Sequence, residues 1–239
     1  MKIHCKRKFS YFCRMKSLHL PPFWHHVHHR CVVSTMLCCE ALGVEPGHFL
    51  LVTADEQTAG RGQRGTVWES AAGGNLTFSV AWRNVGVAAR DQFLLSEAVA
   101  MSVAESVEEL LREVGCREAV SVKWPNDVYV GGRKICGMLI EHSLSGAHID
   151  ATMAGIGVNV NQRHFLGDAP NPVSLRQLAG RTFSRAGVLE RIIRHLHAGL
   201  ASVTHEAWTQ ELIHINRRAL VALLKIYSAH SLHAKAVCN

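Results

Sequence analysis

The sequence predicts an α+β fold built on a mixed, largely antiparallel sheet with helices on one side. Short apolar runs rich in β-branched and aromatic residues alternate with glycine-containing turns, as the strands of a sheet do. Two longer segments repeat apolar residues every three or four positions, as helices do. With 239 residues, 48% hydrophobic and 19% charged, the chain can form one domain with a sizeable core.

The first half of the chain is predicted to hold two strands and a long helix. Strands at 49–54 and 76–82 flank a glycine-rich loop at 60–74. Asp91 is the expected N-cap of a helix that ends at Gly115. The apolar period of this helix consists of Leu94, Leu95, Ala98, Met101, Ala104, Val107, Leu110 and Leu111.

The second half adds the remaining strands and a second helix. Strands are expected at 120–124, 127–130, 134–141 and 148–158, the second and third joined by a Gly131-Gly132 hairpin turn. Ser184 is the expected cap of the helix. Its apolar face is formed by Val188, Leu189, Ile192 and Leu196.

The two ends of the chain differ in composition from its centre. Seven of the 26 cations and six of the 16 histidines precede the first acidic residue, Glu40. We therefore expect residues 1–31 to be a basic leader containing His and Cys, either poorly ordered or a mitochondrial targeting segment. Its histidine run at 25–29 is interpreted as an exposed tail. Residues 32–205 would be the functional domain, and residues 206–239 a remnant or truncated C-terminal segment.

Composition also limits the class of protein. The eight cysteines form no C-x-x-C pair, which favours reduced thiols in the cytoplasm. The sequence lacks a run of about 18 apolar residues, so we expect no membrane partner. The net charge of +7 suggests a nucleic-acid-binding protein as an alternative, but it comes from the leader, and the other 19 cations balance the 19 acidic residues. We expect no nucleic-acid partner.

The glycine loop at 60–65 admits several interpretations. Its letters match G-x-G-x-x-G, but no helix start follows it and no acidic residue lies at a strand end near position 80, as a dinucleotide site requires. The sequence lacks the H-R-D and D-F-G motifs of a protein kinase, and Thr66 stands where a P-loop has Lys. Glycines that expose backbone N–H groups, two arginines and Trp68 nevertheless suit an anion attached to a flat base.

Two further polar clusters accompany this loop. The segment 123–127 ends a strand with Lys-Trp-Pro-Asn-Asp, and a hairpin would return Lys134 beside Asn126 and Asp127. Two cations, an amide and a carboxylate suit a nucleotide with its Mg²⁺. Taken singly, the lysines would face solvent and Trp124 would lie in the core. A third segment, 155–161, alternates glycines along a strand, where a ligand can approach closely.

Together these residues resemble the biotin protein ligases, over about residues 32–196. The motifs, in order, are G-R-G-x-x-G at 60–65 followed by Trp68, K-W-P-N-D at 123–127, K-x-x-G-x-L at 134–139 and G-x-G-x-N at 155–159. The resemblance implies a fold like that of class II aminoacyl-tRNA synthetases and biotin synthetases. It further implies a monofunctional ligase, since too few residues precede Ser34 for a DNA-binding domain.

The resemblance implies roles for individual residues. Lys134 and Arg61 would be catalytic. The implied biotin site consists of Ser34, Thr35, Gln57, Gly60, Arg61, Gly62, Gln63, Lys134 and Gly137. The implied nucleotide site consists of Arg64, Trp68, Lys123, Asn126 and Asn159, with Mg²⁺ held through the phosphates near Asn126 and Asp127. Met36 and Gln63 depart from residues frequent in the family.

The activity implied is that of an ATP-dependent ligase. It would activate biotin as biotinyl-AMP and transfer the acyl group to a lysine of biotin carboxyl carrier domains. The protein would be a monomer or homodimer in the cytoplasm, with a mitochondrial location as the alternative. A lipoate or octanoate protein ligase of the same fold is the second candidate for the function.

Overall fold

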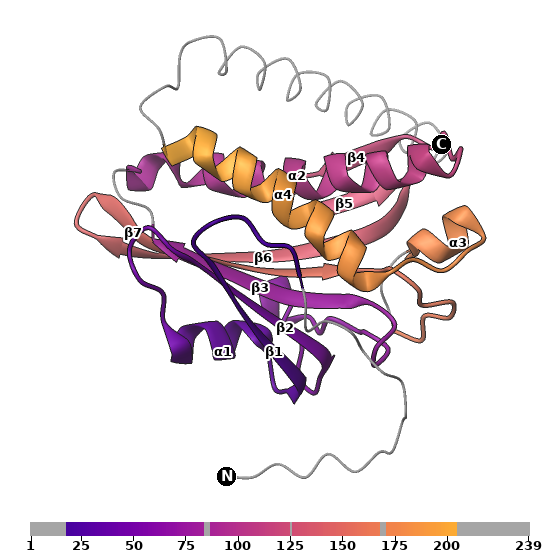
Figure 1. Cartoon of the computed structure of the whole chain (residues 1–239), viewed down its shortest axis with the longest axis horizontal. Helices are drawn as coiled ribbons and strands as arrows, with labels where there is room; N and C mark the ends of the chain where they lie inside the picture. Colours follow the sequence, from indigo (N-terminus) through magenta and orange to yellow (C-terminus); the bar gives the residue numbers. More distant parts are fainter. Residues whose placement is uncertain (1–17, 84–86, 125, 168–170, 205–239) are drawn as a thin grey trace, which may run out of the picture.

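The computed structural model describes residues 18–83, 87–124, 126–167 and 171–204, arranged around one seven-stranded sheet (Figure 1). The spatial order of its strands is β1-β2-β3-β7-β6-β5-β4. The strands are β1 Trp24–Val32, β2 Phe49–Gln57, β3 Leu76–Arg83, β4 Val120–Lys123, β5 Asp127–Val130, β6 Arg133–Ser145 and β7 His148–Val158. The helices are α1 Thr35–Leu42, α2 Gln92–Glu113, α3 Leu175–Ala179 and α4 Arg185–Thr204, with 3₁₀ turns η1 Gln63–Gly65 and η2 Ala89–Asp91.

The sheet is mixed and largely antiparallel, which confirms the predicted fold class. Only β1 and β2 pair in parallel, and the other neighbouring strands pair antiparallel. The β5–β6 turn has positive φ at Gly131 (55°) and Gly132 (77°), as a tight hairpin of the predicted kind requires. This hairpin sets the register that places Asp127 opposite Gly137. The predicted strands and both predicted helices are present, with ends that differ by a few residues.

The two faces of the sheet bear different helices (Figure 1). Leu51, Phe78 and Val80 belong to the larger core, which they share with apolar residues of α2 and α4. The alternate residues of the same strands, among them Val52 and Ala81, pack with Cys39 of α1 on the opposite face. Sequence analysis did not predict α1, because its eight residues have no clear amphipathic period. The two long helices do share one side, but α1 covers part of the other.

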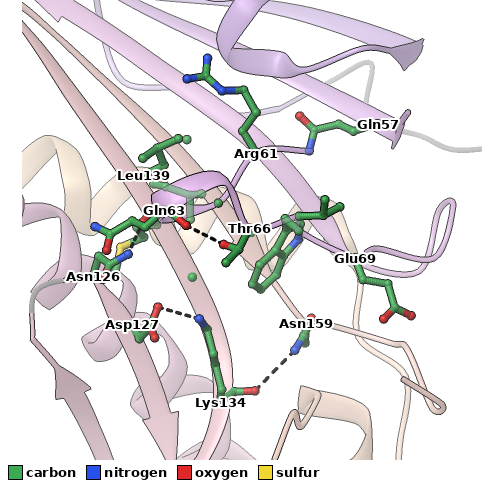
Figure 2. Close-up of a pocket in the computed structure, with 18 of the residues that line it drawn as sticks. Gln57, Arg61, Gln63, Thr66, Glu69, Asn126, Asp127, Lys134, Leu139 and Asn159 are labelled. Carbon is green, nitrogen blue, oxygen red and sulfur yellow. Dashed lines mark hydrogen bonds and ion pairs between the residues drawn. The ribbon is translucent and has the colours of Figure 1, made fainter. Parts of the chain in front are cut away.

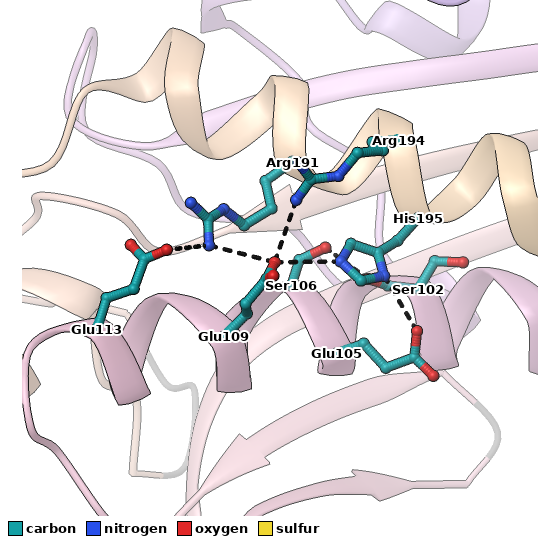
Figure 3. A network of polar contacts seen from close by, with 8 residues as sticks. All are labelled: Ser102, Glu105, Ser106, Glu109, Glu113, Arg191, Arg194 and His195. Carbon is teal, nitrogen blue, oxygen red and sulfur yellow. Dashed lines mark hydrogen bonds and ion pairs between the residues drawn. The ribbon is translucent and has the colours of Figure 1, made fainter.

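A polar network joins α2 and α4 along their exposed edge (Figure 3). The Glu109 carboxylate lies 3.2 Å from nitrogens of Arg191, Arg194 and His195. His195 also reaches Glu105 at 3.1 Å. The hydrogen bond to His195, together with the nearby arginines, lowers the pKa of Glu109. Exposed pairs of this kind contribute about 1 kcal/mol or less each, so apolar packing carries most of the stability of the α2–α4 contact.

The structure corrects the expected domain boundary at residue 31. Residues 24–31 belong to strand β1, so they are part of the domain rather than of a leader. The histidine run is therefore not a tail: His26 and His28 both contact Thr53 Oγ1, at 2.8 and 2.9 Å. No cluster of three or more metal-ligating side chains occurs among the described residues. The other parts of the predicted terminal segments, 1–17 and 206–239, lie outside the described residues.

The structure confirms one smaller expectation, the cap at Ser184, and corrects two others, at Asp91 and Trp124. Ser184 accepts a hydrogen bond from the backbone N–H of Gly187 at 3.3 Å, which confirms it as a cap of α4. Asp91 precedes α2 but makes no side-chain capping bond. Trp124, interpreted as a core residue, is 65% exposed and contacts Phe93 with the two rings tilted by 45°. Within the described ranges, no helix is both long enough and apolar enough to span a membrane.

Candidate active site

A cavity of about 860 Å³ opens beside α1, between the glycine loop and the strands β6 and β7 (Figure 2). We call the cavity-facing parts of β5, β6 and β7 the floor, and residues 60–69 together with 162–167 the rim. Twelve of the residues predicted from the sequence line this one cavity. They are Ser34, Thr35, Gln57, Arg61, Gly62, Gln63, Trp68, Asn126, Asp127, Lys134, Gly137 and Asn159.

One end of the cavity is built from hydrogen-bonded polar side chains at the start of α1. Ser34 is the N-cap, and its hydroxyl accepts from the backbone N–H of Met36 at 3.3 Å. Thr35 donates from its backbone N–H and its hydroxyl to Gln57 Oε1, at 2.7 and 3.1 Å. Its hydroxyl also lies 2.7 Å from that of Ser79 on β3. These bonds fix the side chains of Thr35 and Gln57, so this end can present a preset pattern of polar groups to a ligand.

The glycine loop folds back on itself over the cavity. Backbone N–H groups of Gly62 and Trp68 donate to the carbonyls of Thr66 and Gly60, at 2.7 and 3.0 Å. Gly65 has φ of +78°, a conformation that a residue with a side chain rarely adopts. Arg61 pairs with Glu141 at 3.2 Å, and their side chains are 50% and 41% exposed. Both groups remain largely hydrated, so this ion pair can be exchanged for a ligand at little cost.

Trp68 lies directly on the floor. A Cβ atom added at Gly137 would come within 2.8 Å of the indole ring, and one added at Gly157 would overlap it. Lys134 Nζ lies 5.9 Å from the ring centroid. The indole N–H is buried and finds no hydrogen-bond partner among the described residues. The two glycines are thus required for close approach, as the sequence predicted for Gly157, although the group that approaches them here is Trp68.

The hairpin brings together the charges that the sequence predicted. Lys134 Nζ lies 2.8 Å from Asp127 Oδ1, with the side chains only 22% and 17% exposed. Asn126 donates to the Met138 carbonyl at 2.6 Å, and Asn159 donates weakly to the Lys134 carbonyl at 3.5 Å (Figure 2). Burial, reinforced by the Asp127 charge, raises the pKa of the Cys136 thiol beneath them. The Lys134–Asp127 pair therefore lies against a poorly hydrated part of the protein, where a charge acts strongly on a ligand.

Among the predicted residues whose side chains are described, two do not join the lining. Lys123 is exposed, with Nζ 5.5 Å from the centroid of the Tyr129 ring. Gly60 lines a second cavity of about 350 Å³ next to the glycine loop, which Arg61 and Glu141 also line. The side chain of Arg64 lies outside the described residues.

Sequence reasoning missed part of the lining. These residues are Met36, Thr66, Val67, Glu69, Phe78, Met138, Leu139, Ile156, Phe165, Leu166, Gly167 and Pro172. Most are apolar, and apolar side chains look alike in a sequence whether they face a ligand or the core. Gly155 and Gly157, which the glycine spacing at 155–157 singled out, also line the cavity.

Comparison with known proteins agrees with this geometry. Residues 44–161 match the Biotin/lipoate A/B protein ligase family. The Bifunctional ligase/repressor BirA of Bacillus subtilis is 36% identical over 149 residues, which are 60% of this chain and 43% of the relative. The Biotin--[acetyl-CoA-carboxylase] ligase of Mycobacterium tuberculosis is 32% identical over 163 residues, 68% of this chain and 58% of the relative. The chain thus spans roughly half the length of these relatives.

Solved structures extend the likeness to the fold. The biotin protein ligase from Aquifex aeolicus in complex with biotin and ATP superposes with a TM-score of 0.63 at 29% identity, covering 77% of this chain and 74% of that one. The biotin protein ligase from Leishmania major in complex with biotinyl-5-AMP gives a TM-score of 0.65 at 26% identity, with coverages of 86% and 81%. The fold is that of the biotin protein ligases. The chain carries a domain of the Biotin/lipoate A/B protein ligase family.

Proposed function

We propose that this protein is an ATP-dependent biotin protein ligase, which forms biotinyl-AMP and transfers biotin to a lysine of a biotin carboxyl carrier domain. The observation that carries the proposal is the convergence of Lys134, Asp127, the glycine loop and the polar end at Thr35 on one cavity. The relatives and solved structures named above support the choice of biotin and ATP.

In the first step the biotin carboxylate attacks the α-phosphorus of ATP, and pyrophosphate leaves. Two anions must approach each other, so cations directed at the reacting atoms lower the barrier. Lys134 is suited to this role because its ammonium lies in a poorly hydrated part of the cavity. Arg61 can exchange Glu141 for a substrate anion, since that pair is half exposed. The polar end at Thr35 and Gln57 would hold the head group of biotin, which leaves the carboxylate toward Lys134.

In the second step the amine of a carrier lysine attacks the mixed anhydride, and AMP leaves. No covalent enzyme intermediate is required, so the protein has to position the reactants and keep water from the anhydride. The rim can do this, because Trp68 and Leu166 line the cavity from two different segments. Trp68 also offers a flat face on which adenine can stack.

Mg²⁺ would enter with ATP rather than occupy a site made by the protein. Asp127 is committed to Lys134, and Asn126 contributes one further oxygen, a donor set that suits a cation held mainly by phosphates and water. When bound, Mg²⁺ would offset phosphate charge. We place the reaction in the cytoplasm, which agrees with the five free cysteines found among the described residues.

ATP–pyrophosphate exchange with biotin and with lipoate, offered separately, tests the proposal. We expect exchange that depends on biotin. The family that residues 44–161 match also contains lipoate ligases, so lipoate is the second candidate for the acyl substrate. Exchange that responds only to lipoate would replace biotin in the proposal, and exchange with neither acid would refute the activity.

A further inference from the structure

Glu69, which no motif singled out, is held by the 162–167 segment of the rim. Its Oε1 accepts from the backbone N–H of Leu166 at 3.1 Å, and its Oε2 from that of Gly167 at 2.5 Å. The side-chain amide of Gln162 also donates to Oε1, at 3.4 Å. Successive backbone N–H groups that converge on one anion form a nest, and hydrogen bonds to an ionised acceptor are stronger than neutral ones. The contact is therefore a firm link between two separate segments.

Gly167 leaves space for the Glu69 carboxylate, and Gln162 connects the contact to buried residues. A Cβ atom at Gly167 would overlap Glu69 Oε2, so only glycine leaves room for the contact. Gln162 is 6% exposed, and its own Oε1 accepts from Asn75 Nδ2 at 2.5 Å and from the Ala71 N–H at 3.0 Å. The link thus ends on buried polar groups next to β3, not on a loose surface loop.

Glu69 follows Trp68 directly, so it fixes one side of that residue. The other side is held by the bond from the Trp68 N–H to the Gly60 carbonyl, at 3.0 Å. Between these two anchors the indole lies on Gly137 and Gly157. Without the Glu69 contact, only the Gly60 side and the floor would hold the ring in place.

The carboxylate is placed to connect segments rather than to act on a ligand. Both of its oxygens accept from N–H groups of the protein. The cation at the reacting end, Lys134, already pairs with Asp127, and Figure 2 shows the Glu69 carboxylate turned away from that pair.

We propose that Glu69 is a positioning residue for Trp68 and thereby sets the affinity for the nucleotide, with little effect on the affinity for biotin. The inference rests on the proposed function, in which Trp68 stacks on adenine. The polar end that would hold biotin uses Thr35 and Gln57. The hydrogen bonds of Thr35 run to Gln57 and Ser79, and none of these three bonds involves the Glu69 link.

The test compares Glu69→Ala and Glu69→Gln with the parent protein in biotin-dependent ATP–pyrophosphate exchange and in calorimetric titration with biotin. Loss of a charged hydrogen-bonded contact should raise the KM for ATP about tenfold in Glu69→Ala. Glu69→Gln keeps one acceptor oxygen, so its KM for ATP should lie between those of the parent protein and Glu69→Ala. The matched control is Glu118→Gln, which alters a half-exposed carboxylate paired with Arg133 away from the cavity, and should leave both constants unchanged.

A fluorescence readout reports on Trp68 itself. The Trp68 spectrum of the parent protein is its emission minus that of Trp68→Phe, and the Trp68 spectrum of Glu69→Ala is its emission minus that of the double variant. The Trp68 spectrum should shift to the red when Glu69 is lost. An unchanged Trp68 spectrum, or an unchanged KM for ATP, would overturn the proposal. Equal losses for ATP and biotin with a lowered Tm would also overturn it, in favour of a purely structural role. If the parent protein shows no exchange, the proposed function fails and the nucleotide part of this inference fails with it, whereas the spectrum still decides whether Glu69 positions Trp68.

Discussion

Two ion pairs border the cavity, and their surroundings differ. On the floor, Lys134–Asp127 is mostly buried at 2.8 Å and is fixed by the pairing of β5 with β6. On the rim, Arg61–Glu141 is about half exposed at 3.2 Å and depends on a glycine loop. A desolvated pair held by strands keeps its geometry before any ligand arrives, whereas an exposed pair contributes about 1 kcal/mol or less and exchanges easily. The floor is thus preformed for chemistry, and the part of the rim that carries Arg61 is suited to respond to substrates.

The largest expected effect comes from the floor pair. Lys134→Ala should lower biotinyl-AMP formation by about 10²–10³-fold, because it removes a cation directed at the reacting anions. Lys123→Ala is the matched control, since that exposed lysine lies outside the cavity lining and should change the rate less than about twofold by the usual tolerance of surface sites. Rapid-quench measurement of the adenylate compares them. Similar rates for both variants would show that Lys134 is only a surface residue.

The next effect concerns the glycines of the floor. Gly157→Ala should weaken nucleotide binding more than Gly155→Ala does, because a Cβ atom at Gly157 meets the rigid Trp68 indole. At Gly155 the added atom comes within 2.6 Å of the Met36 sulfur, near the end of a flexible side chain that can move away. Calorimetric titration with a non-hydrolysable ATP analogue measures both. The reverse order would mean that Trp68 does not rest on Gly157 in solution.

The rim residues should separate the two ligands. Arg61→Ala is expected to weaken the binding of biotin and biotinyl-AMP, since it removes a forked charge. Trp68→Ala should mainly weaken the binding of the nucleotide, since it removes a stacking face. Losses of about 1–3 kcal/mol are typical for such contacts. Titration of each variant with each ligand gives the comparison. Equal losses throughout would indicate that the loop acts only as a unit.

The smallest effect should come from the edge strand far from the floor. Burial, and then the neighbouring His28, lowers the pKa of His26 below 6.5. The unfolded chain then binds the proton more readily, so the free energy of unfolding should decrease as the pH falls below about 6.5. His26→Gln should reduce this dependence. Urea denaturation between pH 8 and pH 5 measures it, and an identical slope in both proteins would assign the dependence to other groups.

The sequence predicted the parts of this molecule that carry a local signal. The Gly131-Gly132 turn, the helix α2 and the capping Ser184 each depend on neighbouring residues, and each is present, although the buried face of α2 includes Val99 and Val103 rather than Leu94 and Met101. The grouping of Lys134 with Asp127 also followed, because a two-residue hairpin leaves few possible registers.

The missed features depend on distant partners. Strand β1 contains four histidines and does not look like a strand, yet pairing with β2 and hydrogen bonds to Thr53 hold it in the sheet. Glu69 is an ordinary acidic residue until the fold brings the N–H groups of Leu166 and Gly167 to it, 97 and 98 positions away. Lys123 illustrates the opposite case, since its motif predicted a site role but the structure leaves it over Tyr129.

Hydrogen exchange most directly tests the contrast between the floor and the tip of the glycine loop, residues 61–67, which lies between the Gly60 and Trp68 anchors. The amides of residues 61–67 and those of β6 and β7 would be followed in the free protein and with biotinyl-AMP. We predict that the strand amides are protected in both states, whereas those of 61–67 exchange quickly in the free protein and become protected with the ligand. Full protection of 61–67 without biotinyl-AMP would contradict this prediction and show that the loop tip, like the floor, is preformed.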